Sequence, residues 1–126
     1  MYNKKESVED YLEKILMLKE KSGFVRAIDL ANFMSFSKAS VSVALKKLKS
    51  YGYVTVDEKT GEINLTPEGK EIGEKTYERH LVISQMLISL GVKEETAYED
   101  ACQIEHILSE ETFNKIKEHY QNYIKK

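Results

Sequence analysis

The sequence predicts a mainly α-helical protein with one small β-hairpin, and two observations support this fold class. Apolar residues recur every three or four positions over most of the 126-residue chain, the spacing of amphipathic helices. Residues 51–66 instead carry the residue types of two short strands, separated by the turn sequence Glu58-Lys59-Thr60-Gly61. We therefore expect several helices interrupted once by a hairpin.

Composition limits the classes of protein that the chain could be. Charged residues make up 32% of the sequence, and no apolar run approaches the roughly 20 residues that cross a bilayer, so no membrane partner is expected. The single cysteine excludes an intrachain disulfide, and no apolar signal core follows the charged start. We expect a cytoplasmic protein of one or two small domains.

The net charge of −2 hides a segregation of charge along the chain. Residues 21–50 carry six Lys or Arg against one Asp, a balance of +5, whereas residues 67–126 carry eight basic against twelve acidic residues, a balance of −4. This division predicts a basic binding face in the first half and another task for the second half.

The first half has the element order of a winged helix-turn-helix. Ser7 is the expected N-cap of a first helix of about fourteen residues, and residues 27–34 and 38–50 form two further helices around a short turn. Such a pair of helices is also a common way of packing, and lysines at a helix end can simply complement its dipole. The hairpin that directly follows favours a DNA-binding winged helix, with residues 38–50 as the helix that enters the major groove.

Particular side chains are candidates for contacting double-stranded DNA. Small polar residues at the start of the reading helix can approach base edges, and basic residues around it can meet phosphates. These candidates are Ser37, Lys38, Ser40 and Lys46 in or beside that helix, Arg26 at the start of the preceding helix, and Lys59 in the wing.

The second half is predicted to be entirely helical. Thr66-Pro67 is a strong helix start, and the helix should run about 23 residues to Gly91. A helix over residues 93–108 and a last helix capped by Ser109 follow. The last helix has an aromatic and apolar stripe typical of a core or a subunit interface. We place the domain boundary between residues 1–66 and 67–126.

The stretch around Cys102 carries the most specific chemistry of this half. Cys102, Glu105 and His106 stand at i, i+3 and i+4, so on a helix they share one face and together offer three side chains that bind metals. Taken alone, Asp10 and Glu13 on the first helix are most simply interpreted as surface charges, and His80 as a hydrogen-bonded packing residue. What completes the shell is therefore left open by the residues themselves.

The chain resembles the diphtheria-toxin-repressor and manganese-transport-regulator family of metal-dependent repressors. The resemblance covers almost the whole chain. It rests on residues 9–15 in the first helix, Leu65-Thr66-Pro67-Glu68-Gly69 after the wing, Tyr77-Glu78-Arg79-His80, and residues 102–106. It implies a C-terminal metal-binding and dimerisation domain, a homodimer, and operator DNA as the partner.

The resemblance also implies a ligand set and a class of metal. Carried over position by position, it makes Asp10, Cys102, Glu105 and His106 the primary site and places Glu13 and His80 on further ligand positions. A carboxylate at position 10 favours Mn(II), whereas the softer Cys102 is compatible with Fe(II), Co(II) or Zn(II), so we expect Mn(II) first and Fe(II) second. The family also reads thymine methyls through small apolar side chains, which adds Ala39 and Val43 to the DNA contacts.

Two departures from the family pattern limit this resemblance. Ser84 and Tyr98 stand where iron-type members with an ancillary site have a carboxylate and a histidine, so no ancillary site of that kind is expected. The chain also ends soon after Tyr123, so we expect it to resemble the compact members without an SH3-like domain.

Two other functions are compatible with parts of the sequence. A winged-helix regulator similar to the multiple-antibiotic-resistance regulators would sense an organic ligand in its helical half, and would bind no metal stoichiometrically. A metallohydrolase is a more distant alternative, because a hydrolase needs an open coordination position beside a substrate cleft. We expect a regulator and not an enzyme.

Overall fold

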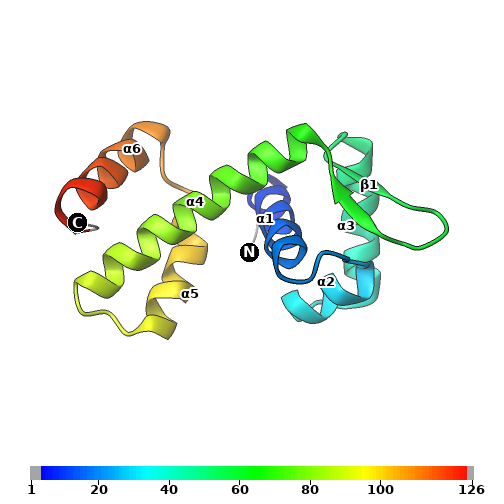
Figure 1. Cartoon of the computed structure of the whole chain (residues 1–126), viewed down its shortest axis with the longest axis horizontal. Helices are drawn as coiled ribbons and strands as arrows, with labels where there is room; N and C mark the ends of the chain where they lie inside the picture. The colour runs from blue at the N-terminus through cyan, green and yellow to red at the C-terminus, as the bar shows by residue number, and fades with distance from the viewer. Residues whose placement is uncertain (1–3, 125–126) are drawn as a thin grey trace. The chain divides into compact units, whose positions relative to one another are not determined.

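The computed structural model describes residues 4–124, and the chain forms two compact units in it. The first unit runs to Glu74 and the second starts at Lys75. The helices are α1 (Lys4–Ser22), α2 (Ala27–Met34), α3 (Lys38–Ser50), α4 (Pro67–Ser89), α5 (Glu94–Ile104) and α6 (Glu110–His119), followed by the π-helix η1 (Tyr120–Ile124). Strands β1 (Val54–Val56) and β2 (Ile63–Leu65) form the hairpin (Figure 1). The predicted fold class is confirmed.

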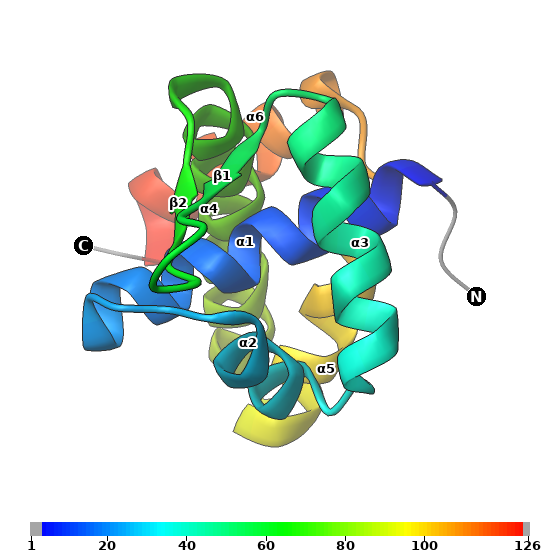
Figure 2. The same cartoon turned by 90° about the vertical axis from the view of Figure 1, so that its right-hand side faces the viewer.

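The first unit is a three-helix cluster with the hairpin packed onto it. Its core consists of buried apolar residues from α1, α2, α3 and both strands: Tyr11, Leu12, Ile15, Val25, Leu30, Ala31, Val41, Leu45, Leu48, Val54 and Ile63. β1 contacts α3, and β2 contacts α1. In Figure 2, α3 is toward the viewer, and the hairpin of β1 and β2 lies beside it.

The hairpin is held by main-chain pairing at both ends. Val54 faces Leu65 and Val56 faces Ile63 in antiparallel register, and the Ile63 N–H donates to the Val25 carbonyl at 2.7 Å. At the tip, the Asp57 carboxylate accepts hydrogen bonds from the Thr60 and Lys59 N–H groups, both at 2.8 Å. These two bonds hold the pKa of Asp57 below its ordinary value of 3.8.

The start of α4 belongs to the first unit for a steric reason. The Thr66 hydroxyl caps the helix by accepting from the Gly69 N–H at 3.1 Å, as expected, and it donates to the Gly52 carbonyl at 2.6 Å. A side chain at Gly69 would collide with the Tyr53 carbonyl, and a Cβ at Gly73 would lie 3.0 Å from the Leu12 carbonyl oxygen of α1. Close backbone contacts thus hold the first two turns of α4 against the first unit, and the compact units divide eight residues after the sequence-based boundary.

Two helix limits differ from the prediction. α1 begins at Lys4, so Ser7 lies inside the helix and is not its N-cap. Lysine and glutamate are good helix formers, so nothing in residues 4–6 stops the helix earlier. α5 ends at Ile104 and not near residue 108, which leaves Glu105 as its C-cap and His106 in the following turn.

The other limits agree with the sequence. α2 and α3 have the predicted bounds, α4 spans the predicted 23 residues before the left-handed Gly91 (φ 102°), and the Ser109 hydroxyl caps α6 by accepting from the Thr112 N–H. No helix within residues 4–124 is long and apolar enough to cross a membrane.

Candidate functional site

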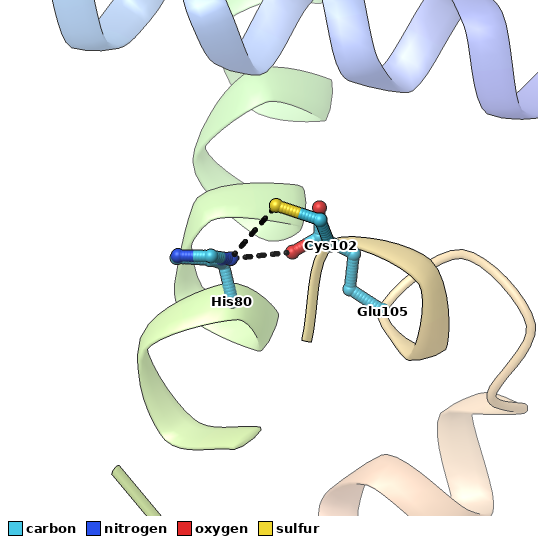
Figure 3. A group of neighbouring side chains, drawn as sticks. All are labelled: His80, Cys102 and Glu105. Carbon is cyan, nitrogen blue, oxygen red and sulfur yellow. Dashed lines mark hydrogen bonds and ion pairs between the residues drawn. The ribbon is translucent and has the colours of Figure 1, made fainter. Parts of the chain in front are cut away.

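The second unit brings a histidine, a cysteine and a carboxylate together. His80 lies on α4, Cys102 in the last turn of α5, and Glu105 directly after α5. The His80 Nδ1 is 3.8 Å from the Cys102 Sγ and 3.3 Å from the Glu105 Oε2 (Figure 3). One ligand atom from each of the three residues falls within 4.8 Å of the others. This juxtaposition unites residues that the sequence separates by more than twenty positions.

The spacing of these atoms fits a single metal ion. Nitrogen, oxygen and sulfur ligands at roughly 2.0–2.3 Å from one ion lie about 3 to 4 Å from one another in tetrahedral or octahedral geometry. The distances of 3.3 and 3.8 Å fall in this range. The donor set, one imidazole, one thiol and one carboxylate, is of the kind that divalent transition metals bind.

His106 extends the same cluster through the second oxygen of Glu105. Its Nε2 lies 3.4 Å from the Glu105 Oε1, so each oxygen of this buried carboxylate faces a different imidazole. The expected common helix face of Cys102, Glu105 and His106 is only partly realised, because the helix ends before His106. The turn, and not a continuous helix, aims the His106 ring at the carboxylate.

Arg79 holds this turn in place. Its Nη1 donates to the Glu105 carbonyl at 3.1 Å and to the Leu108 carbonyl at 2.7 Å, and its guanidinium lies 5.1 Å from the centre of the Phe113 ring. The two carbonyls that accept these hydrogen bonds lie on either side of His106 in the sequence. Arg79 therefore fixes the backbone of the turn that carries Glu105 and His106 after the end of α5.

Tyr98 covers the His80 ring. The two rings are stacked, with centres 5.9 Å apart and an angle of 27° between their planes. The Tyr98 hydroxyl donates to the Glu94 Oε1 at 3.1 Å, and this hydrogen bond raises the pKa of Tyr98. The residue that departs from the iron-type pattern thus restrains a predicted ligand. The other departure, Ser84, is fully buried, and its hydroxyl donates to the Leu81 carbonyl.

Asp10 and Glu13 lie on α1 of the first unit, and both are buried. Lys14 Nζ contacts the Asp10 Oδ1 at 3.1 Å and the Glu13 Oε1 at 2.8 Å. Within the described part of the chain, no hydrogen-bond donor contacts the second oxygen of Glu13, Oε2. Burial and then the charge of Asp10 raise the pKa of the adjacent Tyr11. Two buried carboxylates on one helix are costly unless something compensates their charge, so the surface-charge interpretation of these residues is wrong.

The predicted DNA contacts all lie on the surface of the first unit. The exposed residues are Arg26, Ser37, Lys38, Ala39, Ser40, Val43, Lys46 and Lys59. Ala39, Val43 and Lys46 share a face of α3 at i, i+4 and i+7, and Val43 is 55% exposed although apolar.

Three of these candidates have structural partners as well. The Ser37 hydroxyl caps α3 by accepting from the Ser40 N–H at 3.1 Å, and the two hydroxyls lie 2.9 Å apart. The Arg26 side chain lies over the Phe24 ring, and its Cδ comes within 3.5 Å of the position that a side chain would take at Gly61 in the wing.

Sequence reasoning assigned no role to Lys14, Arg79 or Tyr98. Tyr98 stands four residues before Cys102, and Lys14 four after Asp10, so helical spacing could have placed each beside a predicted ligand. The partners of Arg79 are backbone carbonyls, which no residue pattern marks.

Two family models match consecutive parts of the chain. One is described as "Iron dependent repressor, N-terminal DNA binding domain" and matches residues 5–61; the other, "Iron dependent repressor, metal binding and dimerisation domain", matches residues 66–125. The HTH-type transcriptional regulator MntR of Bacillus pumilus is 39% identical over 110 residues, which cover 87% of this chain and 76% of MntR. The chain belongs to the iron-dependent repressor family. The resemblance drawn from the sequence is confirmed.

Further members of this family differ in how much of their length the chain spans. An uncharacterized HTH-type transcriptional regulator of Methanocaldococcus jannaschii is 38% identical over 89% of this chain and 90% of its own. The structure of the manganese regulator SloR superposes with a TM-score of 0.80 at 28% identity, and that of the metal-dependent transcriptional regulator MtsR with 0.82 at 26%. Each match covers 90% of this chain and 53% of the solved one, so the chain spans about half the length of these structures.

Proposed function

We propose that this chain is a metal-dependent transcriptional repressor that binds operator DNA as a homodimer when it is loaded with Mn(II) or Fe(II), and so controls genes of metal homeostasis. The observation that carries the proposal is the convergence of His80, Cys102 and Glu105 within 4.8 Å in a chain whose first unit is a winged helix. We place this activity in the cytoplasm, where operator DNA is accessible.

The proposed ligands are Asp10, Glu13, His80, Cys102, Glu105 and His106. The distances around His80, and the buried Glu13 oxygen without a donor in residues 4–124, support this set. The carry-over from the family assigns Asp10, Cys102, Glu105 and His106 to the primary site, with Glu13 and His80 in a second group. Carboxylates from both halves of the chain would then bind the ion jointly.

Manganese is the first candidate metal because half of the proposed ligands are carboxylates, which are hard. Three carboxylates suit Mn(II), while the imidazoles and the single thiol suit Fe(II), Co(II) or Zn(II) equally well. The names of the relatives agree with this choice, since MntR of Bacillus pumilus is a near relative and SloR is named a manganese regulator.

The proposed switch follows from charge. A bound divalent ion supplies positive charge to carboxylates that would otherwise repel one another. The proposed ligands come from the DNA-binding half and from the acidic half. An ion bound by ligands of both halves would therefore favour the arrangement of the two halves in which all these ligands can reach it. Only a metal that prefers this arrangement can shift the population toward the form that binds DNA.

The DNA contacts are proposed for the exposed face of α3 and the wing. Ala39 and Val43 can touch thymine methyls, Ser40 can reach base edges, and Lys38 and Lys46 can meet phosphates. In a two-fold dimer, two copies of α3 would enter successive major grooves.

Exposed apolar side chains of the second unit are the candidates for the dimer interface. Tyr123 on η1 is 72% exposed and Leu81 on α4 is 43% exposed. The shallow cavity between α4, α6 and η1, about 350 Å³ in volume, is lined by Leu81 and Tyr120 among others. The sequence predicted an interface or a core for this stripe. Phe113 is buried in the fold, which leaves the η1 end of the stripe for a partner.

The decisive experiment measures DNA affinity with and without metal. Fluorescence anisotropy with a two-fold symmetric operator duplex should show tight binding in excess Mn(II) or Fe(II) and binding weaker by at least about tenfold in chelator. Cys102→Ala and His106→Ala should lose stoichiometric metal binding and this difference, whereas Gln103→Ala, an exposed neighbour on α5, should retain both.

Equal DNA affinity in chelator and in excess metal would contradict the proposed switch. Absence of stoichiometric metal binding in the wild type would point instead to a regulator that senses an organic ligand.

A further inference from the structure

Lys14 occupies the position between two predicted metal ligands. Its Nζ lies 3.1 Å from the Asp10 Oδ1 and 2.8 Å from the Glu13 Oε1, so one ammonium group serves both carboxylates. All three residues are on α1, where positions i, i+3 and i+4 share a face. The protein thus holds a cation of its own against the oxygens that would bind a metal ion.

Burial distinguishes this contact from an ordinary surface ion pair. The side chains of Asp10 and Glu13 are 8% and 0% exposed, and that of Lys14 is 18% exposed. A second lysine of α1, Lys19, pairs with Glu62 at 3.0 Å, but that carboxylate is 31% exposed. Water screens the Lys19 pair, whereas Asp10 and Glu13 depend on a nearby cation to offset the cost of their burial.

We propose that Lys14 is a built-in competitor of the metal ion and sets the concentration of free metal at which the repressor responds. This inference rests on the proposed function, in which Asp10 and Glu13 are ligands. The Asp10 Oδ1 and the Glu13 Oε1 cannot keep their contacts with Nζ and bind an ion through the same lone pairs. If the ion engages the other oxygens instead, Lys14 remains close to it as a like charge.

A competitor and a purely structural lysine differ in the sign of their effect on metal affinity. Loss of the Lys14 charge removes the compensation of two buried carboxylates, so the metal-free protein becomes less stable. The same loss removes the competitor, so the metal binds more tightly. A lysine that only positioned the carboxylates would, when lost, weaken both stability and metal affinity.

The test compares Lys14→Gln, Lys14→Arg and Lys19→Gln. Titration calorimetry with Mn(II) should give about tenfold tighter binding for Lys14→Gln than for the wild type, the change expected for one charge-assisted contact. Lys14→Arg keeps the charge and should stay near the wild type. Lys19→Gln changes the net charge equally on the same helix and should leave the metal affinity unchanged. Thermal unfolding in chelator should show a lower Tm for Lys14→Gln.

A second measurement is made on the wild type and needs only the charge-conserving variant Lys14→Arg, to assign a signal. In ¹⁵N spectra of the lysine ammonium groups, the Lys14 signal, assigned by its absence in Lys14→Arg, should be protected from exchange without metal and should shift when Zn(II) is added.

Three results would overturn either the role of Lys14 or the proposed function. Equal or weaker metal binding by Lys14→Gln, or a Lys14 signal that does not change when the wild type binds Zn(II), would overturn the role of Lys14 alone. A wild type that binds no divalent ion would overturn the proposed function.

Discussion

Arg79 should control metal affinity without touching the metal. Its Nη1 joins the Glu105 and Leu108 carbonyls at 3.1 and 2.7 Å, and its guanidinium lies over the Phe113 ring. Hydrogen bonds from a charged donor contribute about 1.5–3 kcal/mol each, and a cation–π contact about 0.5–1 kcal/mol. Water can replace part of the bonding to carbonyls in a turn. We therefore expect Arg79→Ala to lower the free energy of unfolding by about 2–4 kcal/mol.

The effect on the metal follows from what the turn carries. With Arg79 absent, the backbone of Glu105 and His106 is no longer fixed relative to α4, and binding must also order this turn. Loss of groups that orient metal ligands typically weakens affinity by about 10–100-fold, which we expect here. Arg79→Lys keeps the charge but not the planar guanidinium that lies over the Phe113 ring, so its metal affinity should fall between those of the wild type and Arg79→Ala.

Urea unfolding of the metal-free protein and titration calorimetry with Mn(II) measure the two effects of Arg79→Ala separately. Lys70→Ala, an exposed lysine on the same helix, should change neither quantity by more than about 0.5 kcal/mol. A variant that is destabilised as expected but binds Mn(II) like the wild type would refute the positioning role. An unchanged free energy of unfolding would refute the estimated strength of the contacts.

Three further predictions concern the first unit. Lys46→Ala should weaken binding to all DNA sequences alike. It should also lower the slope of log affinity against log salt concentration by about 1, as measured by anisotropy at several salt concentrations. A changed sequence preference at unchanged affinity would contradict a phosphate role. Because the folded pKa of Asp57 is lowered by the N–H groups of the wing turn, its contribution to stability should be present above pH 4 and disappear as the pH falls through the folded value. The stability difference between wild type and Asp57→Asn should therefore shrink in acid, and an Asp57 pKa at or above 3.8 by NMR titration would argue against it. Gly69→Ala should destabilise the first unit by about 2 kcal/mol or more, because its Cβ meets the Tyr53 carbonyl. Thermal unfolding measures this loss, with Lys70→Ala as the control. A clearly smaller loss would mean that α4 shifts to make room for the methyl group.

Local patterns were enough to predict most of the elements. The caps at Thr66 and Ser109, the helix stop at Gly91 and the limits of α2 and α3 depend on residues a few positions apart, and all are observed. The winged-helix order and the basic reading helix follow from the same local information. Family membership followed as well, because it rests on short motifs that keep their order along the chain.

The early end of α5 could not be predicted from the chain itself. Residues 93–108 have a continuous helical pattern, whereas in the structure α5 ends at Ile104 and Arg79, 26 residues before Glu105, donates to the Glu105 and Leu108 carbonyls of the turn that follows. A contact at that separation leaves no periodic signal in the sequence. The environment of Asp10 and Glu13 is a similar case, because burial depends on packing and not on residue type.

By itself, the sequence determined the fold class, the family and the residue types able to bind a metal ion, since these depend on local periodicity, capping and the residue types of short motifs. Only the tertiary structure decided that His80 joins Cys102 and Glu105, that Tyr98 covers His80, and how deeply the α1 carboxylates are buried around Lys14. The physical reason is that distances between side chains far apart in the sequence, and their separation from water, are set by how whole helices pack.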